Sequence, residues 1–271
     1  MNIGIIGNGF VGGAVGFGMA EVAEIRTYDV DPMLRTHELD EVIDKSQFLF
    51  VTVPTPMSDT GKIDLSIIED VCSKISASDK YTDDKIVILK STIVPGTTRT
   101  IKEKYNLNLV FNPEFLTERR AKADFINPAR IVIGADDKKT FNKLKKLYQK
   151  RFRKTPILHC SLEEAEMIKY MCNCFFSVKV SFLNEMRQIS DALGNNWDNL
   201  LDGFLLDQRI GYSHCSVPGP DGQFGFAGHC FPKDLNAFIC RAKELGVAPI
   251  VMEAAWEKNL EVRPSARNEN S

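Results

Sequence analysis

Short apolar runs alternate with segments of mixed polarity through the first half of the chain. The intervening segments have helical periodicity, for example Leu65–Ile75, which follows the candidate N-cap Asp64. Strands that alternate with helices predict βαβ units and an α/β fold with a Rossmann-like, doubly wound, mostly parallel sheet. The expected strands are Ile3–Ile6, Ile25–Tyr28, Phe48–Val53, Ile86–Leu89, Leu109–Phe111 and Ile131–Ile133, with Thr155–Leu158 as a further candidate.

The second half has the pattern of helices rather than strands. Ser161 and Glu164 have the spacing of a capping box, and a helical pattern continues from there to about Leu193, where Gly194 is a natural stop. We expect the polar tail after Arg263 to fray.

Two further segments of the second half are predicted to be helical. Residues 195–210 have a helical pattern, residues 211–229 form a Gly-, Pro- and Ser-rich loop, and Pro232 suits the first position of another helix. We therefore expect a Rossmann-like domain over residues 1–155 and a smaller, all-helical domain over residues 156–271.

Composition narrows the class of protein. The chain has 271 residues, is 44% hydrophobic and carries a formal net charge of −2, which argues against disorder and against a nucleic-acid partner. No apolar run is long enough to span a membrane. The seven cysteines contain no C-x-x-C pair and the histidines show no ligand spacing, so we expect no metal site and reduced thiols in the cytoplasm.

The first chemical motif is a glycine-rich turn after the first expected strand. Gly7, Gly9 and Gly12 form G-x-G-x-x-G, and Asp29 lies at the end of the next strand, where a carboxylate can bind the ribose hydroxyls of NAD. The alternative is an ordinary glycine-rich turn, but the strand, the following helix and the acid together favour NAD. The cofactor-binding candidates of this motif are Gly7, Gly9, Phe10, Val11, Gly12 and Asp29.

The second motif is centred on Cys230, just before an expected helix. A thiol at a helix N-terminus with Lys233 nearby ionises readily and suits a nucleophile, and Asp234 can return to the same site. The alternative is a buried structural cysteine, against which the glycine-rich approach to Cys230 argues.

Polar pairs elsewhere complete the candidate site. Lys169 and Asn173 share one helix face, where a cation and an amide can stabilise an oxyanion. Glu114 and Thr92 each follow an expected strand, at the sheet edge where α/β proteins bind ligands. Taken singly, such residues are more often surface pairs or capping groups.

Together these segments resemble the UDP-glucose/GDP-mannose dehydrogenase family along nearly the whole chain. The resemblance rests on the glycine turn, Val53–Pro56, Gly61–Ser66, Lys90–Thr97, Asn112–Glu118, Asn127–Gly134, Lys169 with Asn173, Ser181–Glu185, Arg209–Gly211 and Gly225–Asp234. It implies an NAD-dependent, four-electron oxidation of a sugar C6 alcohol to a carboxylate, with UDP-glucose as the leading substrate.

The resemblance also implies a role for each matching residue. Cys230 would capture the aldehyde as a thiohemiacetal, and water would hydrolyse the thioester formed by the second oxidation. The implied catalytic residues are Cys230, Lys169, Asn173, Asp234, Glu114 and Thr92. Thr55, Thr92, Glu118 and Lys233 are implied to contact the cofactor. Substrate-binding positions are Glu114, Phe115, Leu116, Glu118, Lys169, Asn173, Arg209 and Ala227.

The resemblance further implies a homodimer built on the long helix, with Arg209 reaching the neighbouring subunit's substrate. Three departures affect substrate recognition: the family's C-terminal nucleotide-binding domain is expected to be absent, Ala227 replaces a glycine, and the loop before Cys230 is longer. The alternatives are therefore another nucleotide sugar, such as GDP-mannose or a UDP-N-acetyl-hexosamine, or a catalytically silent NAD-binding subunit that needs a partner.

Overall fold

A single sheet organises the first part of the protein. In the computed structural model, its strand order is β2-β1-β3-β4-β5-β6-β7, and every adjacent pair is parallel except β5 and β6, which are antiparallel. The strands are β1 (Asn2–Ile6), β2 (Glu24–Tyr28), β3 (Phe48–Val51), β4 (Ile86–Leu89), β5 (Leu109–Phe111), β6 (Ile131–Gly134) and β7 (Ile157–Cys160).

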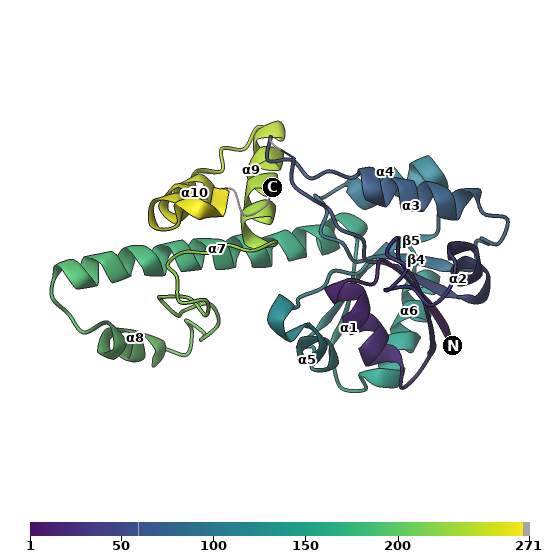
Figure 1. Cartoon of the computed structure of the whole chain (residues 1–271), viewed down its shortest axis with the longest axis horizontal. Coiled ribbons are helices and arrows are strands. Elements are labelled where there is room, and N and C mark those ends of the chain that lie inside the picture. Colours follow the sequence, from purple (N-terminus) through teal and green to yellow (C-terminus); the bar gives the residue numbers. More distant parts are fainter. Residues whose placement is uncertain (59, 268–271) are drawn as a thin grey trace. The chain divides into compact units, whose positions relative to one another are not determined.

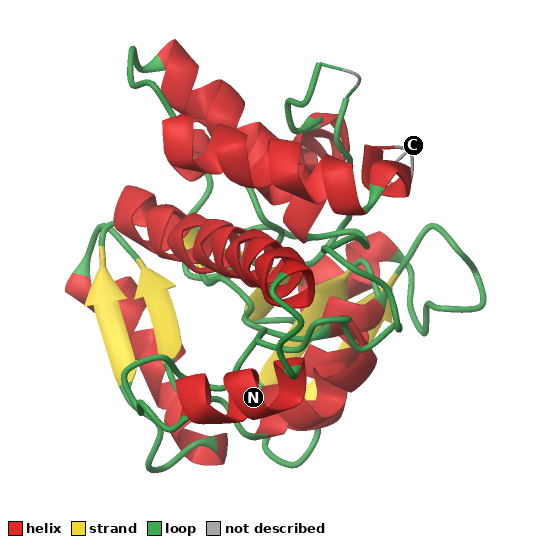
Figure 2. Ribbon diagram, turned by 90° about the vertical axis from the view of Figure 1, so that its left-hand side faces the viewer, coloured by secondary structure: helices red, strands yellow, loops and turns green. Residues whose placement is uncertain are grey.

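Helices cover both faces of this sheet, and two apolar clusters fill the space beneath them (Figures 1 and 2). One face is covered by α1 (Phe10–Met19), α5 (Ala121–Ile126) and α6 (Lys138–Arg151). The other face is covered by α2 (Leu39–Lys45), α3 (Ser66–Ala77), α4 (Thr97–Tyr105) and the start of α7 (Leu162–Ala192). The predicted Rossmann-like α/β fold is confirmed, with the antiparallel β5–β6 pair as its one departure from a parallel sheet.

The local signals in the sequence match local structure closely. The capping box at the start of α7 is formed in both directions, because Ser161 Oγ accepts from the Glu164 amide at 3.2 Å and Glu164 Oε2 accepts from the Ser161 amide at 2.7 Å. Asp64 accepts from the Ser66 amide at 2.8 Å, but the N-cap of α3 is Leu65, so the prediction of Asp64 as the N-cap was wrong by one residue. Gly194, two residues after α7, has the positive φ of +71° that favours glycine.

The structure describes residues 1–58 and 60–267, and these separate into two units. The first contains Met1–Thr55 and Asp64–Lys169, and the second contains Pro56–Ile63 together with residues from Tyr170 onward. The division therefore falls inside α7, whereas the sequence placed it at residue 155. The reason is that β7 extends the sheet and the first turns of α7 bury apolar side chains on it.

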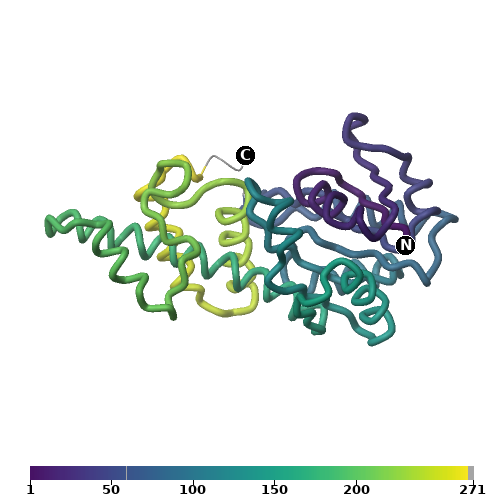
Figure 3. The backbone as a smooth tube through the Cα atoms, turned by 90° about the horizontal axis from the view of Figure 1, so that it is seen from below, coloured from purple at the N-terminus to yellow at the C-terminus, as the bar shows by residue number. Residues whose placement is uncertain are grey.

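The second unit is helical apart from its loops. The C-terminal part of α7 packs against α8 (Trp197–Leu205), which runs back beside it (Figure 3), through Leu183 and Trp197. On α10 (Ile250–Val262), the Ala255 carbonyl accepts from Ser181 Oγ of α7 at 2.6 Å, and α10 also contacts α9 (Phe231–Glu244). The sequence did not predict α10.

Three other observations concern the described chain. Residues Pro264–Arg267 form a short 3-10 helix, η2, where fraying was expected, and residues 268–271 of that tail lie outside the described residues. Among the described residues, no helix is long and apolar enough to cross a membrane. The same residues contain no cluster of three or more metal-binding side chains.

Candidate active site

The glycine turn between β1 and α1 leaves room for a ligand against the backbone. Gly7 has a φ of +90°, and a Cβ on Gly12 would lie 2.1 Å from the Gly7 carbonyl oxygen, so both positions require glycine. A Cβ on Gly9 would meet nothing within 4 Å. Gly9 is the N-cap of α1, which Phe10 and Val11 begin. This open, positively polarised helix end fits a diphosphate.

Asp29 lies beside the same turn. Its carboxylate accepts hydrogen bonds from the Asn8 amide at 2.6 Å and from the Asp31 amide at 3.0 Å. The acid is thereby fixed at the end of β2 next to the glycine turn, as the sequence predicted. These residues fit a dinucleotide whose ribose carries free hydroxyl groups, which is the form found in NAD.

Thr55 and Thr92 follow β3 and β4 and meet at the same edge of the sheet. Thr55 Oγ1 donates to the Thr92 carbonyl oxygen at 3.0 Å, and Thr55 is buried. Glu118 lies further along the chain, exposed at the start of the short 3-10 helix η1 (Glu118–Arg120). The structure therefore joins the two threonines directly and leaves the Glu118 side chain on the surface of this unit.

Glu114 forms a buried ion pair in the first unit. Its Oε1 accepts from Lys169 Nζ at 2.8 Å, and its Oε2 accepts from the Leu116 amide at 2.6 Å. The exposed fractions of Glu114 and Lys169 are 7% and 3%. The Arg130 guanidinium lies 4.1 Å from the ring centroid of the adjacent residue, Phe115. A largely buried carboxylate of this kind can act as a base toward a bound water.

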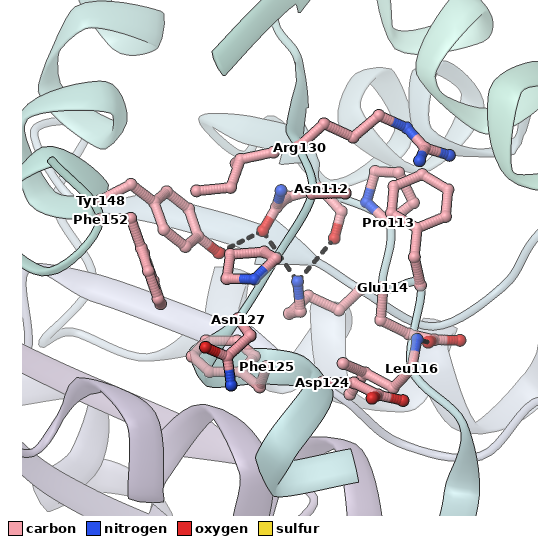
Figure 4. A pocket seen from close by; sticks show the side chains of 15 residues that line it. Asn112, Pro113, Glu114, Leu116, Asp124, Phe125, Asn127, Arg130, Tyr148 and Phe152 are labelled. Carbon is pink, nitrogen blue, oxygen red and sulfur yellow. Dashed lines mark hydrogen bonds between the residues drawn. The ribbon is translucent and has the colours of Figure 1, made fainter. Parts of the chain in front are cut away.

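A cavity of about 290 Å³ opens beside Glu114 (Figure 4). Leu116 and the aromatic rings of Phe115, Phe125, Tyr148 and Phe152 contribute to its lining. Lys90 and Asn112 also line the cavity, and Lys90 Nζ donates to the carbonyl and to Oδ1 of Asn112. Lys90 belongs to one of the family-like segments but was not predicted to be a site residue, and neither was Tyr148.

The second unit contains the other group of predicted residues. Cys230 is the N-cap of α9, as expected for a thiol at a helix N-terminus, and its carbonyl accepts from the Asp234 amide at 2.9 Å. Asp234 is 1% exposed, and its carboxylate accepts from Asn173 Nδ2 at 2.5 Å and from Lys233 Nζ at 2.6 Å. Lys233 and Asp234 therefore form an ion pair.

The loop that leads to Cys230 is anchored by buried amides. Asn259, which is fully buried, accepts from the Phe226 amide at 2.7 Å and donates to the Phe226 carbonyl at 2.9 Å. Asn184 accepts from the Gly225 amide at 3.0 Å. Ala227 follows these anchors and is partly buried. The anchors fix the backbone four and five residues before Cys230.

Arg209 stands apart from these groups. Its side chain is 89% exposed and forms an ion pair with Asp207, with Nη2 and Oδ2 2.5 Å apart. Within the described chain the structure does not bring Arg209 to the other candidate residues of the second unit.

Comparisons with known proteins also divide the chain in two, but between residues 152 and 163, an interval that contains the boundary expected from the sequence. Residues 30–152 match the model of the UDP-glucose/GDP-mannose dehydrogenase family, NAD binding domain, and residues 163–261 match that of the family's central domain. The chain is 32% identical over 257 residues to UDP-glucose 6-dehydrogenase AglM of Haloferax volcanii, covering 89% of this chain and 58% of that protein. It is 36% identical over 232 residues to UDP-glucose 6-dehydrogenase of Rickettsia bellii, covering 83% and 52%.

A solved structure agrees in fold. A UDP-glucose dehydrogenase from the archaeon Pyrobaculum islandicum superimposes with a TM-score of 0.84 at 28% identity, covering 96% of this chain and 68% of that one. The chain therefore spans slightly more than half the length of the curated relatives that it matches.

Proposed function

Because the chain belongs to the UDP-glucose/GDP-mannose dehydrogenase family, we propose that it oxidises the C6 alcohol of a nucleotide sugar to a carboxylate with NAD. UDP-glucose is the leading substrate, since the similar curated proteins are named UDP-glucose 6-dehydrogenases. The observation that carries the proposal is the buried pair of Glu114 and Lys169, a base and a cation held in reach of one another.

The glycine turn and Asp29 would hold the cofactor. The positive φ of Gly7 and the open space at Gly9 admit the diphosphate, and Asp29 would accept from the ribose hydroxyls. Thr55, Thr92, Glu118 and Lys233 are the other proposed cofactor contacts. NAD, when bound, supplies the acceptor for the hydride that leaves the sugar carbon in each oxidation.

The first oxidation requires the alcohol to lose a proton as well as a hydride. Asp234 would take up the hydroxyl proton, with Thr92 holding a water. The Asp234 carboxylate already accepts a hydrogen bond from Asn173 Nδ2 at 2.5 Å. Lys169 and Asn173, one turn apart on α7, would stabilise the alkoxide that develops on oxygen. The product of this half-reaction is the aldehyde.

The second oxidation needs a nucleophile so that the aldehyde is not released. The thiolate of Cys230 would form a bond to the aldehyde carbon and give a thiohemiacetal, whose loss of a second hydride leaves a thioester. Glu114 would then take a proton from water as it attacks the thioester, and the C–S bond breaks to return the thiolate and the carboxylate product. Phe115, Leu116 and Ala227 would contact the substrate around this centre.

We also propose that the chain forms a homodimer through α7. Large apolar side chains repeat along this helix on exposed positions, with Met171, Phe175, Phe182 and Ile189 each between 47% and 61% exposed. Their spacing of four to seven residues places them along one stripe, which is the pattern of a helix that meets another helix. In such a dimer Arg209 would exchange Asp207 for a substrate bound to the partner.

A variant of the nucleophile tests the chemistry. Cys230→Ala should abolish carboxylate formation, whereas Cys240→Ala, on the same helix but hydrogen-bonded to the Thr60 carbonyl, should leave it unchanged. Product analysis after incubation with NAD and UDP-glucose, GDP-mannose or a UDP-N-acetyl-hexosamine identifies the substrate. Full oxidation by Cys230→Ala would contradict the thioester route.

A further inference from the structure

Lys90 is a buried lysine with no acidic side chain as its direct hydrogen-bond partner among the described contacts. It follows β4 directly and is 3% exposed. Its Nζ donates to the Asn112 carbonyl at 3.0 Å and to Asn112 Oδ1 at 2.9 Å. Burial lowers the pKa of Lys90 to about 7, an effect that the nearby Glu114 carboxylate opposes and Lys169 reinforces. Placing an ammonium here is costly, which indicates that its contacts serve more than packing.

Asn112 is held at every polar atom. Besides the two bonds from Lys90, its Oδ1 accepts from the Tyr148 hydroxyl, and its Nδ2 donates to the Val132 carbonyl at 2.6 Å. Its amide donates to the Leu89 carbonyl at 2.9 Å. Figure 4 shows the Tyr148 hydroxyl directed at the Asn112 side chain. Because both the oxygen and the nitrogen of this amide are hydrogen-bonded, its orientation is fixed.

Asn112 is connected to Glu114, the proposed base, through a short stretch of backbone. Pro113, whose ring restricts the backbone, separates Asn112 from Glu114. The Glu114 carboxylate in turn lies between Lys169 and the Leu116 amide. The buried charges around this carboxylate are thus those of Lys169 and Lys90, while the cavity is further lined by the ionisable groups of Asp124, Arg130 and Tyr148.

We propose that Lys90 is a positioning residue for Glu114, holding its backbone through Asn112 and adding a second positive charge to the environment of its carboxylate. The reaction part of this inference rests on the proposed function, but the coupling between the two side chains does not. While Lys90 is protonated, two buried cations around one carboxylate favour the anions that form when water attacks a thioester next to it. Tyr148 also helps to position Asn112, because its hydroxyl donates to the same oxygen, Asn112 Oδ1.

The coupling can be measured without any substrate. In the purified chain with isotope-labelled lysine, the side-chain signal of Lys90, assigned by its loss in Lys90→Met, should titrate near neutral pH. Glu114→Gln should move this midpoint to lower pH, because the carboxylate favours the charged ammonium. Asp124→Asn, which changes another acid of the cavity lining, should leave it in place. An unmoved midpoint in Glu114→Gln would overturn the inference.

Lys85 provides a matched control for the reaction. It immediately precedes β4, as Lys90 follows it, and its Nζ donates to the carbonyls of Ile43, Asp44 and Ser46 at 2.8 to 3.0 Å. Lys90→Met should slow carboxylate release at least about tenfold and change its pH profile, while KM for NAD stays the same. Lys85→Met should lose stability without that kinetic change.

A milder change guards against loss of the fold. Tyr148→Phe removes one donor to Asn112 and keeps both lysines, so it should slow carboxylate release in the same direction but by less than Lys90→Met. Equal kinetics in Lys90→Met and Lys85→Met would refute the positioning role. If no nucleotide sugar is oxidised at all, the proposed function fails and the titration of Lys90 still decides whether the coupling exists.

Discussion

Lys169 Nζ lies 2.8 Å from Glu114 Oε1, and the two side chains are exposed to solvent by only 4% and 6%. A buried pair of this kind stabilises little relative to apolar residues, but removing one partner leaves an uncompensated charge. Its presence between α7 and the segment after β5 is therefore better explained by chemistry than by stability.

This pair predicts a strongly non-additive result. Lys169→Met alone should lower the free energy of unfolding by about 3 kcal/mol, because the Glu114 carboxylate loses its counter-ion. The double variant Lys169→Met with Glu114→Gln should cost less than the sum of the two single changes. Urea denaturation of the four proteins measures this. Additive effects would show that the two side chains do not interact in solution.

A second buried carboxylate caps α4. Glu166, fully buried on α7, accepts from the Gly96 amide at 2.6 Å, the Thr98 amide at 2.7 Å and the Thr98 hydroxyl at 2.6 Å. Glu166→Ala should cost about 3 kcal/mol, since these donors lose their acceptor in the interior. The exposed capping residue Glu164 serves as the control, with an expected cost for Glu164→Ala of about 1 kcal/mol or less. Equal losses in thermal unfolding would argue against the cap.

Two substitutions in the glycine turn should have different effects, one on cofactor binding and the other on stability. Gly9→Ala should fold normally, because its Cβ meets nothing within 4 Å, but should weaken NAD binding at least about tenfold by crowding the diphosphate. Gly12→Ala should lower the melting temperature, because its Cβ would lie 2.1 Å from the Gly7 carbonyl. Calorimetric titration with NAD and thermal denaturation measure both. Undiminished NAD affinity in Gly9→Ala would place the cofactor elsewhere.

The buried lysine predicts a pH dependence of stability. Burial lowers the pKa of Lys90 from 10.5 to about 7, so between these values the unfolded chain binds more protons at this residue. Stability must therefore rise with pH across this window, by up to about 1.4 kcal/mol for each pH unit from this group. Wild type should gain stability relative to Lys90→Met between about pH 7.5 and about pH 9.5. A constant difference between the two proteins would contradict a buried, titrating Lys90.

The sequence predicted the features that depend on local patterns. The strands, the capping box of Ser161 and Glu164 and the stop at Gly194 follow from hydrophobic runs and from backbone chemistry. The position of Asp29 beside the glycine turn also followed, since the spacing from Gly12 to the end of the next strand fixes it. Local patterns decide these features because neighbouring residues supply all of the relevant contacts.

Features that depend on distant contacts were not predicted. The division between the units falls inside α7 because only the sheet shows which turns of that helix it buries. Tyr148 joins Asn112 from a separate helix, and a tyrosine in an amphipathic helix gives no sign of such a partner. A charged residue directly after a fully apolar strand, as Lys90 is, was the one available signal for this network.

The most direct measurement of the central claim is the amount of NADH formed per molecule of UDP-glucose consumed by the purified chain with excess NAD. The account predicts two NADH per sugar and UDP-glucuronate as the product, because one thiol-bearing site performs both oxidations before release. Bound NAD with no NADH from any of the three nucleotide-sugar classes would contradict it and would favour a catalytically silent subunit.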